Sequence, residues 1–185
     1  GIVDAFVTRL RAALVRAAVK ALDDEPDAEI TLRGLAKAVG VSPMAPYAHF
    51  DDKDALLDAV AIEGFDALAT SLRTALDRQG VRDEPDQMLE ALGKAYVAFG
   101  LQRPGLYRVM FARPARPRGD PVREAGEAAF KPLASVFEDR GAEARQCAEI
   151  AWSFVHGLTM LVRTGFLDAG GHSDRHIEMA SKAFA

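Results

Sequence analysis

Apolar residues recur along most of this chain at intervals of three and four positions, the period of a helix with one buried face. The stretch from Val3 to Leu22 follows this period, as do residues 53–77, 86–101 and 122–137. No stretch alternates apolar and polar residues in the way that a half-buried strand does. The pattern predicts an all-α chain of about nine helices.

The most apolar long stretch, from Glu143 to Leu167, carries apolar residues on more than one side of the predicted helix. A helix of this kind has to be covered twice. A stripe of small residues would let another helix approach closely, and this helix and the last one are expected to pair with their copies in a second subunit. The residues expected at this homodimer interface are Ser153, Gly157, Thr164, Ile177, Ala180 and Phe184. The sequence pattern is compatible with either face of the 143–167 helix forming the dimer interface.

Two short helical segments flank Gly40 between Thr31 and Leu57. Thr31 and Ser42 have side-chain oxygens suited to capping the start of a helix, and Gly40 can adopt the left-handed conformation that ends one. Two short helices joined by a glycine turn form a helix-turn-helix, which can place its second helix in the DNA major groove. Tyr47 and the residues after it then bring polar groups suited to gripping phosphates.

The spacing of these residues resembles the DNA-binding signature of the tetracycline-repressor (TetR) family of bacterial regulators. The matching residues are Gly40-Val41-Ser42, Tyr47-x-His49-Phe50 and Lys53-x-x-Leu56-Leu57. A second set resembles the regulatory-domain subgroup named for its Trp-His-Gly motif: Trp152-x-x-x-His156-Gly157, Arg103-Pro104-Gly105-Leu106-Tyr107 and Met110-Phe111. The resemblance implies a three-helix DNA-binding domain over residues 1–52 and a helical regulatory domain over residues 53–185, joined by a long helix.

By this resemblance, one group of residues holds the phosphate backbone and another faces the base edges. The residues expected at the DNA are Thr31, Arg33, Lys37, Ser42, Pro43, Met44, Ala45, Tyr47, His49 and Lys53. The base-facing residues, Pro43, Met44 and Ala45, include no arginine or asparagine for bidentate recognition. Contact with thymine methyl groups, DNA shape and dimer geometry should therefore carry most of the specificity.

Pro46 departs from the family pattern, which usually has a helix-compatible residue just before the tyrosine. If Ser42 caps the second helix, Pro46 is its fourth residue, where the missing N–H and the ring disturb the first helical hydrogen bond. A loosened or 3₁₀-like first turn is expected.

The charge of the chain does not by itself indicate nucleic-acid binding. The net charge is −4 with a pI near 5.6, and the stretch from Arg9 to Leu57 holds seven Lys and Arg against eight Asp and Glu. Binding must therefore depend on where the cations lie, and we expect it to weaken steeply with salt. The acidic segment from Asp23 to Glu29 is expected to face away from DNA.

A second set of residues, mostly aromatic, is a candidate ligand pocket in the regulatory domain. Its members are Tyr96, Phe99, Tyr107, Met110, Phe111, Trp152 and His156. Side chains of these types at helical spacing also form ordinary core, and His156 is equally suited to a hydrogen-bonded core position. With a pocket, the chain is expected to be a ligand-responsive repressor released from operator DNA by a small molecule. The alternative is a helical ligand-binding or scaffolding homodimer that has lost sequence-specific DNA binding.

Other functional classes find little support in the sequence. The single cysteine, Cys147, excludes an internal disulfide and a multi-cysteine metal site, and no apolar run approaches the roughly 20 residues that cross a membrane. No glycine-rich phosphate loop is present, and no base is evident near Cys147. His172 and His176 have a metal-compatible spacing, although a surface role suits their polar segment better. We expect a cytoplasmic protein without enzyme activity, cofactor or metal.

Overall fold

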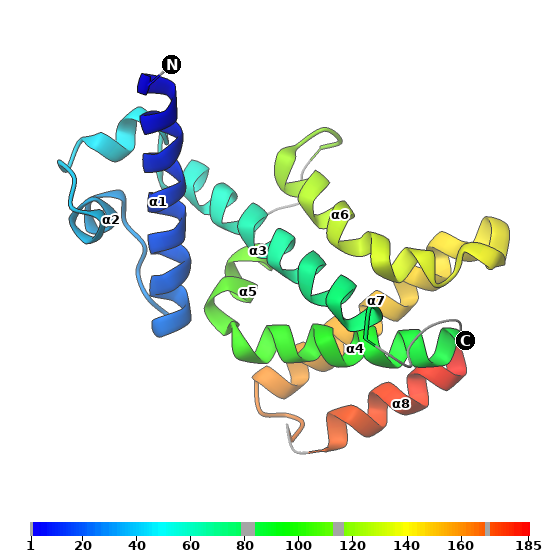
Figure 1. The fold of residues 1–185 in the computed structure, drawn as a ribbon. Coiled ribbons are helices and arrows are strands. Elements are labelled where there is room, and N and C mark those ends of the chain that lie inside the picture. The colour runs from blue at the N-terminus through cyan, green and yellow to red at the C-terminus, as the bar shows by residue number, and fades with distance from the viewer. Residues whose placement is uncertain (1, 79–83, 113–116, 169–170) are drawn as a thin grey trace. The chain divides into compact units, whose positions relative to one another are not determined.

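This computed structural model describes residues 2–78, 84–112, 117–168 and 171–185, with the side chains of residues 2–7 and 172 outside that description. The described residues fold into eight α-helices and two 3₁₀ helices, and no strand occurs among them (Figure 1). The helices are α1 (Ile2–Asp24), α2 (Leu32–Val39), η1 (Ala45–Ala48), α3 (Lys53–Leu76), α4 (Pro85–Gln102), α5 (Pro104–Phe111), α6 (Pro121–Ser135), η2 (Glu138–Glu143), α7 (Ala144–Arg163) and α8 (His172–Phe184). The all-α prediction is confirmed.

The chain divides into two compact units that alternate along the sequence. The first unit combines Gly1–Phe65 with Arg103–Glu124, and the second combines Asp66–Gln102 with Ala125–Ala185. This division differs from the single boundary at residue 52 that the sequence suggested, because α5 packs with α1 in the first unit. Helix α3 begins in the first unit and ends in the second.

The first unit is built around α1, which contacts both α2 and α5. The apolar period of α1 explains this arrangement, since Leu14, Ala18 and Leu22 are fully buried along one side of the helix. Leu35 of α2 and Leu56 of α3 are buried in the same unit. Phe6, which belongs to the same sequence pattern, has its side chain outside the described residues.

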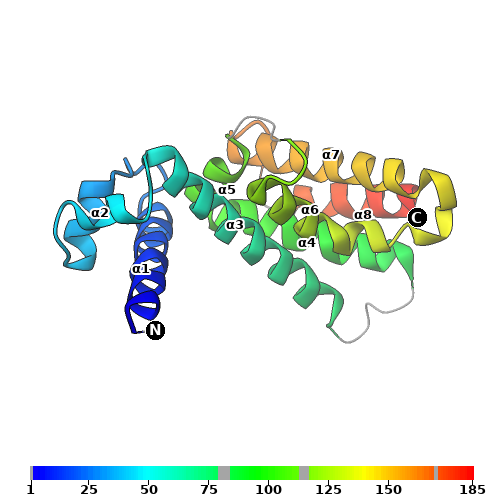
Figure 2. The same cartoon turned by 90° about the horizontal axis from the view of Figure 1, so that it is seen from above.

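The second unit is organised around α4, which lies beside α7 and α8 (Figure 2). It meets α8 at Gly93, where the side chain of Ile177 fits into the space left by the missing Cβ. Ile177 is only 3% exposed. A separate apolar cluster buries Leu89 of α4 against Phe137, Ala148 and Ala151. No helix in the described part of the chain is long and apolar enough to cross a membrane.

Replacing Gly93 with alanine is expected to destabilise the protein by about 1–2 kcal/mol, because the added methyl group over-packs this contact. A Cβ at residue 93 would lie 2.7 Å from Cγ2 of Ile177, a branched side chain with little room to retreat. Leucine has no methyl group in the Cγ2 position, so Ile177→Leu should restore part of the loss in the double variant. Urea unfolding of the four proteins measures the coupling, and additive losses would contradict the contact.

Candidate nucleic-acid interface and regulatory site

The first helix of the helix-turn-helix, α2, is closed at both ends by the residues that the sequence indicated. The Thr31 side-chain oxygen accepts a hydrogen bond from the backbone N–H of Gly34 at 3.1 Å. Gly40 has a φ of 81°, and its backbone N–H donates to the carbonyl of Ala36 at 2.9 Å. The N-cap at Thr31 and the left-handed glycine at residue 40 are confirmed.

The second helix of the motif is the four-residue 3₁₀ helix η1 rather than an α-helix. The Ser42 carbonyl accepts its hydrogen bond from Ala45 at 3.0 Å, three residues on, since Pro46 has no N–H to offer. The expected 3₁₀-like turn is confirmed and extends to the whole helix. Ser42 lies outside this helix, which begins at Ala45, so its expected capping role is corrected: Met44 holds the N-cap position.

Pro46 also anchors η1, a role that sequence reasoning missed. The side chain of Pro46 is fully buried. By contrast, Met44 is 66% exposed and Tyr47 is 42% exposed. The proline thus fixes one side of the short helix in the core while the opposite side faces solvent. The apolar ring of Pro46, in a turn that otherwise faces solvent, was the sequence feature that could have indicated this buried position.

The ten residues expected at the DNA lie on α2, η1, the turn between them and the start of α3, and none of them is buried. Eight of the ten are exposed, and Ala45 and His49 are half-buried. Lys53 is held at the beginning of α3, which Asp52 caps by accepting a hydrogen bond from the N–H of Ala55 at 2.8 Å. Arg11 of α1 lies over the ring of Phe50, with its guanidinium carbon 5.1 Å from the ring centroid. These contacts set the position of the helix junction from which Tyr47, His49 and Lys53 project.

The acidic residues at the end of α1 and just after it are engaged by Arg103, which precedes α5, and by Arg108 of α5, all within the first unit. The guanidinium of Arg103 donates two hydrogen bonds to the carboxylate of Asp23, at 3.0 and 2.7 Å. Arg108 donates to the carbonyl of Pro26 at 2.9 Å, and its side chain lies 3.9 Å from the carboxylate of Asp27. Part of the negative charge counted between Arg9 and Leu57 is therefore balanced by residues outside that stretch.

Gly105 allows α5 to approach the end of α1 at backbone distance. A Cβ at this position would lie 2.5 Å from the carbonyl oxygen of Leu22 and 2.8 Å from that of Pro26. On the other side of α5, Met110 fills the space beside Gly64 of α3, and the rings of Phe65 and Phe111 meet edge to face at 5.5 Å between centroids. The segment from Arg103 to Phe111 thus fastens α5 to α1 and α3.

The seven residues expected to line a ligand pocket are divided between the two units. Tyr107, Met110 and Phe111 lie on α5 in the first unit, where Tyr107 is completely buried and its ring packs on that of Phe111 at 4.7 Å. Tyr96, Phe99, Trp152 and His156 lie in the second unit. That all seven line one ligand pocket stays a prediction.

A polar cluster joins α4 to α7 in the second unit. The indole N–H of Trp152 donates to the hydroxyl oxygen of Tyr96 at 3.1 Å, and that oxygen lies 3.0 Å from Nδ1 of His156. The ring of Phe130 packs on Trp152 with 5.6 Å between centroids. Trp152 and His156 are one turn apart, so both can reach the single hydroxyl of Tyr96.

His156 is expected to make the stability of the protein depend on pH. Burial, and to a smaller extent the charge of Arg163, lowers the pKa of His156 below its usual 6.5. Below about pH 6.5 the unfolded chain takes up this proton more readily than the folded chain, so the free energy of unfolding should fall as the pH drops. Urea unfolding between about pH 7.5 and 5.5 should show a smaller loss for His156→Gln than for wild type. Equal losses would contradict a buried neutral imidazole.

The residues expected at the dimer interface are divided between surface and core. On α7, Ser153 and Thr164 are exposed and Gly157 is half-buried, and a Cβ on Gly157 would meet nothing within 4 Å. Ala180 and Phe184 of α8 are half-buried. Ile177 instead packs against Gly93 inside the subunit, so its expected place in an interface is corrected. The expected interface left out four large apolar side chains that are exposed, namely Ile150, Met160 and Leu161 on α7 and Met179 on α8.

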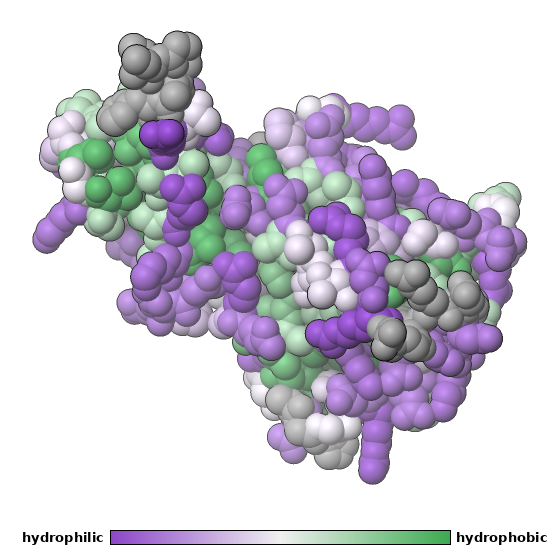
Figure 3. Space-filling model, viewed as in Figure 1, coloured by the Kyte–Doolittle hydropathy of each residue, from purple (hydrophilic) through white to green (hydrophobic). Residues whose placement is uncertain are grey.

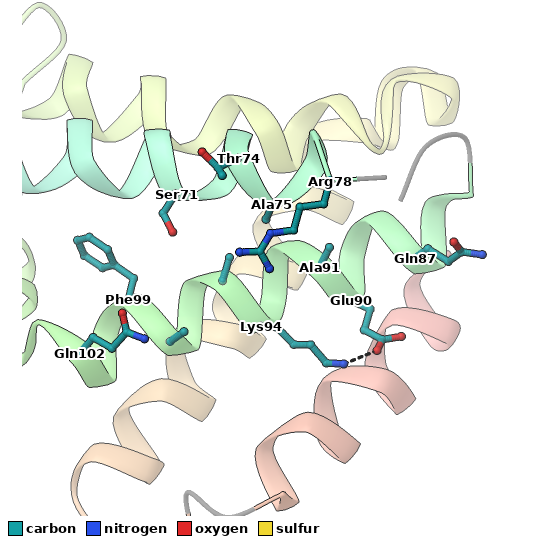
Figure 4. A pocket seen from close by; sticks show the side chains of 12 residues that line it. Ser71, Thr74, Ala75, Arg78, Gln87, Glu90, Ala91, Lys94, Phe99 and Gln102 are labelled. Carbon is teal, nitrogen blue, oxygen red and sulfur yellow. Dashed lines mark hydrogen bonds and ion pairs between the residues drawn. The ribbon is translucent and has the colours of Figure 1, made fainter. Parts of the chain in front are cut away.

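The visible surface of the second unit mixes polar residues with exposed apolar ones (Figure 3). Within the described residues, no three His, Cys, Asp or Glu side chains gather as a metal site requires. His172 falls outside the described side chains, so its expected surface role stays a prediction. A hollow in the second unit lies between α3 and α4 (Figure 4), and Phe99 is the one expected pocket residue among those that line it.

An N-terminal helix-turn-helix in an all-α chain defines a class of DNA-binding regulators. Residues 14–60 match the family profile described as bacterial regulatory proteins of the tetR family, and residues 89–184 match the profile described as the tetracyclin repressor-like C-terminal domain. The chain therefore belongs to the TetR family of bacterial transcription regulators. The Trp-His-Gly subgroup stays a prediction, since neither description names it.

Similar proteins agree with this assignment. The chain is 27% identical over 161 residues to an uncharacterized helix-turn-helix-type transcriptional regulator of Mycobacterium tuberculosis, covering 85% of this chain and 72% of the relative. It is 29% identical over 136 residues to the nucleoid occlusion factor SlmA of Marinobacter nauticus, covering 74% and 65% of the two chains. Regulators of this family bind operator DNA and act as dimers.

Solved structures share the fold over almost the whole chain. A protein of unknown function from Rhodococcus sp. RHA1 superposes with a TM-score of 0.79 at 32% identity, over 95% of this chain and 93% of that one. A TetR family transcription regulator from Marinobacter aquaeolei gives a TM-score of 0.65 at 21% identity, over 94% and 92%. The protein is thus a DNA-binding transcriptional regulator by family.

Proposed function

We propose that this protein is a repressor that binds operator DNA as a homodimer and is released when a small molecule binds its second unit. The observation that carries the proposal is that none of the ten expected DNA-contacting residues is buried, although they surround a well-packed motif. An accessible surface of this composition at the turn and second helix of a helix-turn-helix suits the major groove.

The chemistry of the exposed side chains determines which of them would contact phosphates and which would contact bases. Tyr47 and Lys53 offer a hydroxyl and an ammonium group for phosphate oxygens, which set the register of the protein on the duplex. Met44 and Pro43 precede η1 and offer only apolar contact, which suits the methyl group of thymine. Because η1 has only four residues, few side chains reach the bases, and half-site spacing and DNA shape supply the remaining specificity.

The proposed dimer interface lies on the exposed side of α7 and on α8. Ser153, Gly157 and Thr164 form a strip of small residues on α7, flanked by exposed Ile150 and Leu161. A second copy of the same helix can approach closely along such a strip and cover the apolar side chains beside it. Ala180 and Phe184 extend the interface onto α8, and Ile177 is left out because it is buried within the subunit.

An effector that favours the DNA-free arrangement would shift the population away from the operator complex. Around the Trp152–Tyr96–His156 cluster, a ligand that competes for the hydroxyl of Tyr96 would loosen the link between α4 and α7. Helices α4 and α7 belong to the unit that includes most of the matched C-terminal family domain. The effector in this proposal is a small molecule of unassigned chemistry.

Titration against the DNA upstream of its own gene and against a scrambled duplex, at two salt concentrations, tests the proposal. A repressor binds its own upstream DNA more tightly, and affinity falls as salt rises. Equal and weak binding to both duplexes would favour the second candidate, a helical ligand-binding or scaffolding homodimer without sequence-specific DNA binding. The near balance of acidic and basic residues between Arg9 and Leu57 is the observation in favour of that alternative.

A thermal-shift screen over metabolites tests the ligand-responsive part of the proposal separately. A ligand at about 100 times its dissociation constant stabilises the folded protein by about 2.7 kcal/mol, which a melting curve resolves readily. Each hit is then added to the operator complex. Release of DNA supports repression relieved by ligand, whereas tighter DNA binding in the presence of every hit would contradict it.

A further inference from the structure

An open groove of about 700 Å³ runs between the last turns of α3 and the length of α4 (Figure 4). All of its lining residues belong to the second unit. Its volume lies within the range of small-molecule sites. It is distinct from the Trp152–Tyr96–His156 cluster, since none of those three residues lines it.

The floor of the groove is made of alanines. Ala91, Ala95 and Ala98 follow one another along α4 at intervals of four and three residues, and Ala75 of α3 faces the same space. Small side chains at this spacing leave a shallow apolar trough along the helix axis. Ala91 and Ala98 are seven residues apart, which places them about 10 Å apart along the helix. The floor therefore suits a slender apolar body of similar length.

Charge is concentrated toward one end of the groove. The side chain of Arg78 extends from just beyond α3 into the space above α4 (Figure 4). In the described part of the chain, no hydrogen bond or ion pair engages its guanidinium group. The neighbouring cation, Lys94, is already neutralised by Glu90 at 2.6 Å, which raises the pKa of Lys94. Among its described lining residues, Arg78 and Lys94 stand against Glu90, so the groove carries one excess positive charge.

The opposite end of the groove is formed by Phe99 and Gln102 and carries no charge (Figure 4). Nearby, the hydroxyl of Thr74 donates to the carbonyl of Thr70 at 2.8 Å, so the donor of this rim residue is already used. The lining therefore changes along α4, from the charged groups of Arg78, Glu90 and Lys94 to the apolar and neutral groups at the Phe99 end (Figure 4). A dianion such as a phosphate would meet the carboxylate of Glu90 near the same end, which favours a singly charged head group.

We propose that this groove binds a slender amphipathic carboxylate, of the class of medium-chain fatty acids. The carboxylate pairs with the guanidinium of Arg78, and the apolar tail lies along Ala91, Ala95 and Ala98 toward Phe99. An arginine can hold a carboxylate by two parallel hydrogen bonds, which fixes the head group in one orientation. Binding itself does not depend on the proposed function, and only a consequence for DNA binding rests on it.

Isothermal titration calorimetry of the full chain with three ligands of equal chain length tests the charge preference. The probes are decanoate, 1-decanol and decyltrimethylammonium. Decanoate is expected to bind at one molecule per subunit and more tightly than the alcohol, while the cation binds most weakly because Arg78 repels it. Equal affinity for all three, or uptake of many molecules per subunit, would overturn the proposal.

Three variants locate the site. Arg78→Gln should weaken decanoate binding by about three- to fivefold, the range for a partly exposed ion pair, and leave 1-decanol unchanged. Ala91→Phe should fill the trough and abolish binding of both. Arg73→Gln, on an exposed position of α3 outside the groove, is the matched control and should bind decanoate like wild type. Melting curves without ligand establish that each variant is folded, and wild-type affinity in both groove variants would contradict the assignment.

Adding decanoate to the operator complex separates this inference from the proposed function. DNA release in wild type but not in Ala91→Phe identifies the groove as an effector site. Groove-dependent binding without DNA release leaves the carboxylate site established and counts against its role in repression. A protein that binds decanoate in the groove but never binds DNA specifically would refute the proposed repressor and not the site.

Discussion

Gly105→Ala is expected to lower the free energy of unfolding by about 3 kcal/mol, at the upper end of the usual cost of over-packing. The new methyl group would lie 2.5 Å from the carbonyl oxygen of Leu22 and 2.8 Å from that of Pro26. Both obstacles are backbone atoms at the end of α1, so relief requires that α5 move away from α1. That movement would also stretch the paired hydrogen bonds between Arg103 and Asp23.

Gly64→Ala is the matched control, because it places the same methyl group at another buried glycine of the same unit. There the nearest atoms are Cγ and Sδ of Met110, at 2.6 and 2.7 Å, and they belong to a flexible side chain. A loss of about 1 kcal/mol is expected, well below that for Gly105→Ala. Urea unfolding measures both variants. The reverse order of stability would show that α5 is not held at backbone distance.

Lys53→Ala and Tyr47→Phe are each expected to weaken operator binding by about tenfold, the loss of one charge-assisted hydrogen bond to phosphate. The two variants should differ in their salt dependence. Removing the ammonium group of Lys53 lowers the slope of log affinity against log salt by about one, since one fewer counterion is released. Removing the uncharged hydroxyl of Tyr47 leaves that slope unchanged.

Fluorescence anisotropy with labelled operator DNA over a series of salt concentrations provides both quantities. Lys20→Ala is the control: Lys20 lies on α1, is exposed and pairs with Asp24 at 2.5 Å, outside the helix-turn-helix. It should keep both the affinity and the slope of wild type. If Lys53→Ala left the slope unchanged, Lys53 would not contact phosphate.

Local structure could be predicted from the sequence wherever one residue decides it. Thr31 and Gly40 close α2 as their side-chain chemistry requires, and the missing N–H of Pro46 led correctly to a 3₁₀ turn. The capping role predicted for Ser42 was wrong because a residue can be identified as an N-cap only when the start of the following helix is known. That helix begins at Ala45, two residues later than a helix capped by Ser42 would begin.

Long-range arrangement was harder to predict, because helical spacing shows which face of a helix is buried and not what covers it. Tyr107 and Met110 are buried as expected of apolar residues, and they belong to the first unit whereas Tyr96 belongs to the second. The interior position of Ile177 depends on Gly93, a residue 84 positions earlier. The alanines of the α3–α4 groove were overlooked because small residues carry little periodic signal.

The alternation of the two units along the chain has a consequence for how the protein is made. Residues up to Phe65 leave the ribosome long before α5, which completes the first unit by packing on α1 and α3. Until Arg103 and Arg108 have been synthesised, the carboxylate of Asp23 and the carbonyl of Pro26 lack their hydrogen-bond donors. The DNA-reading part of the chain therefore reaches its final packing only after much of the regulatory part has been translated.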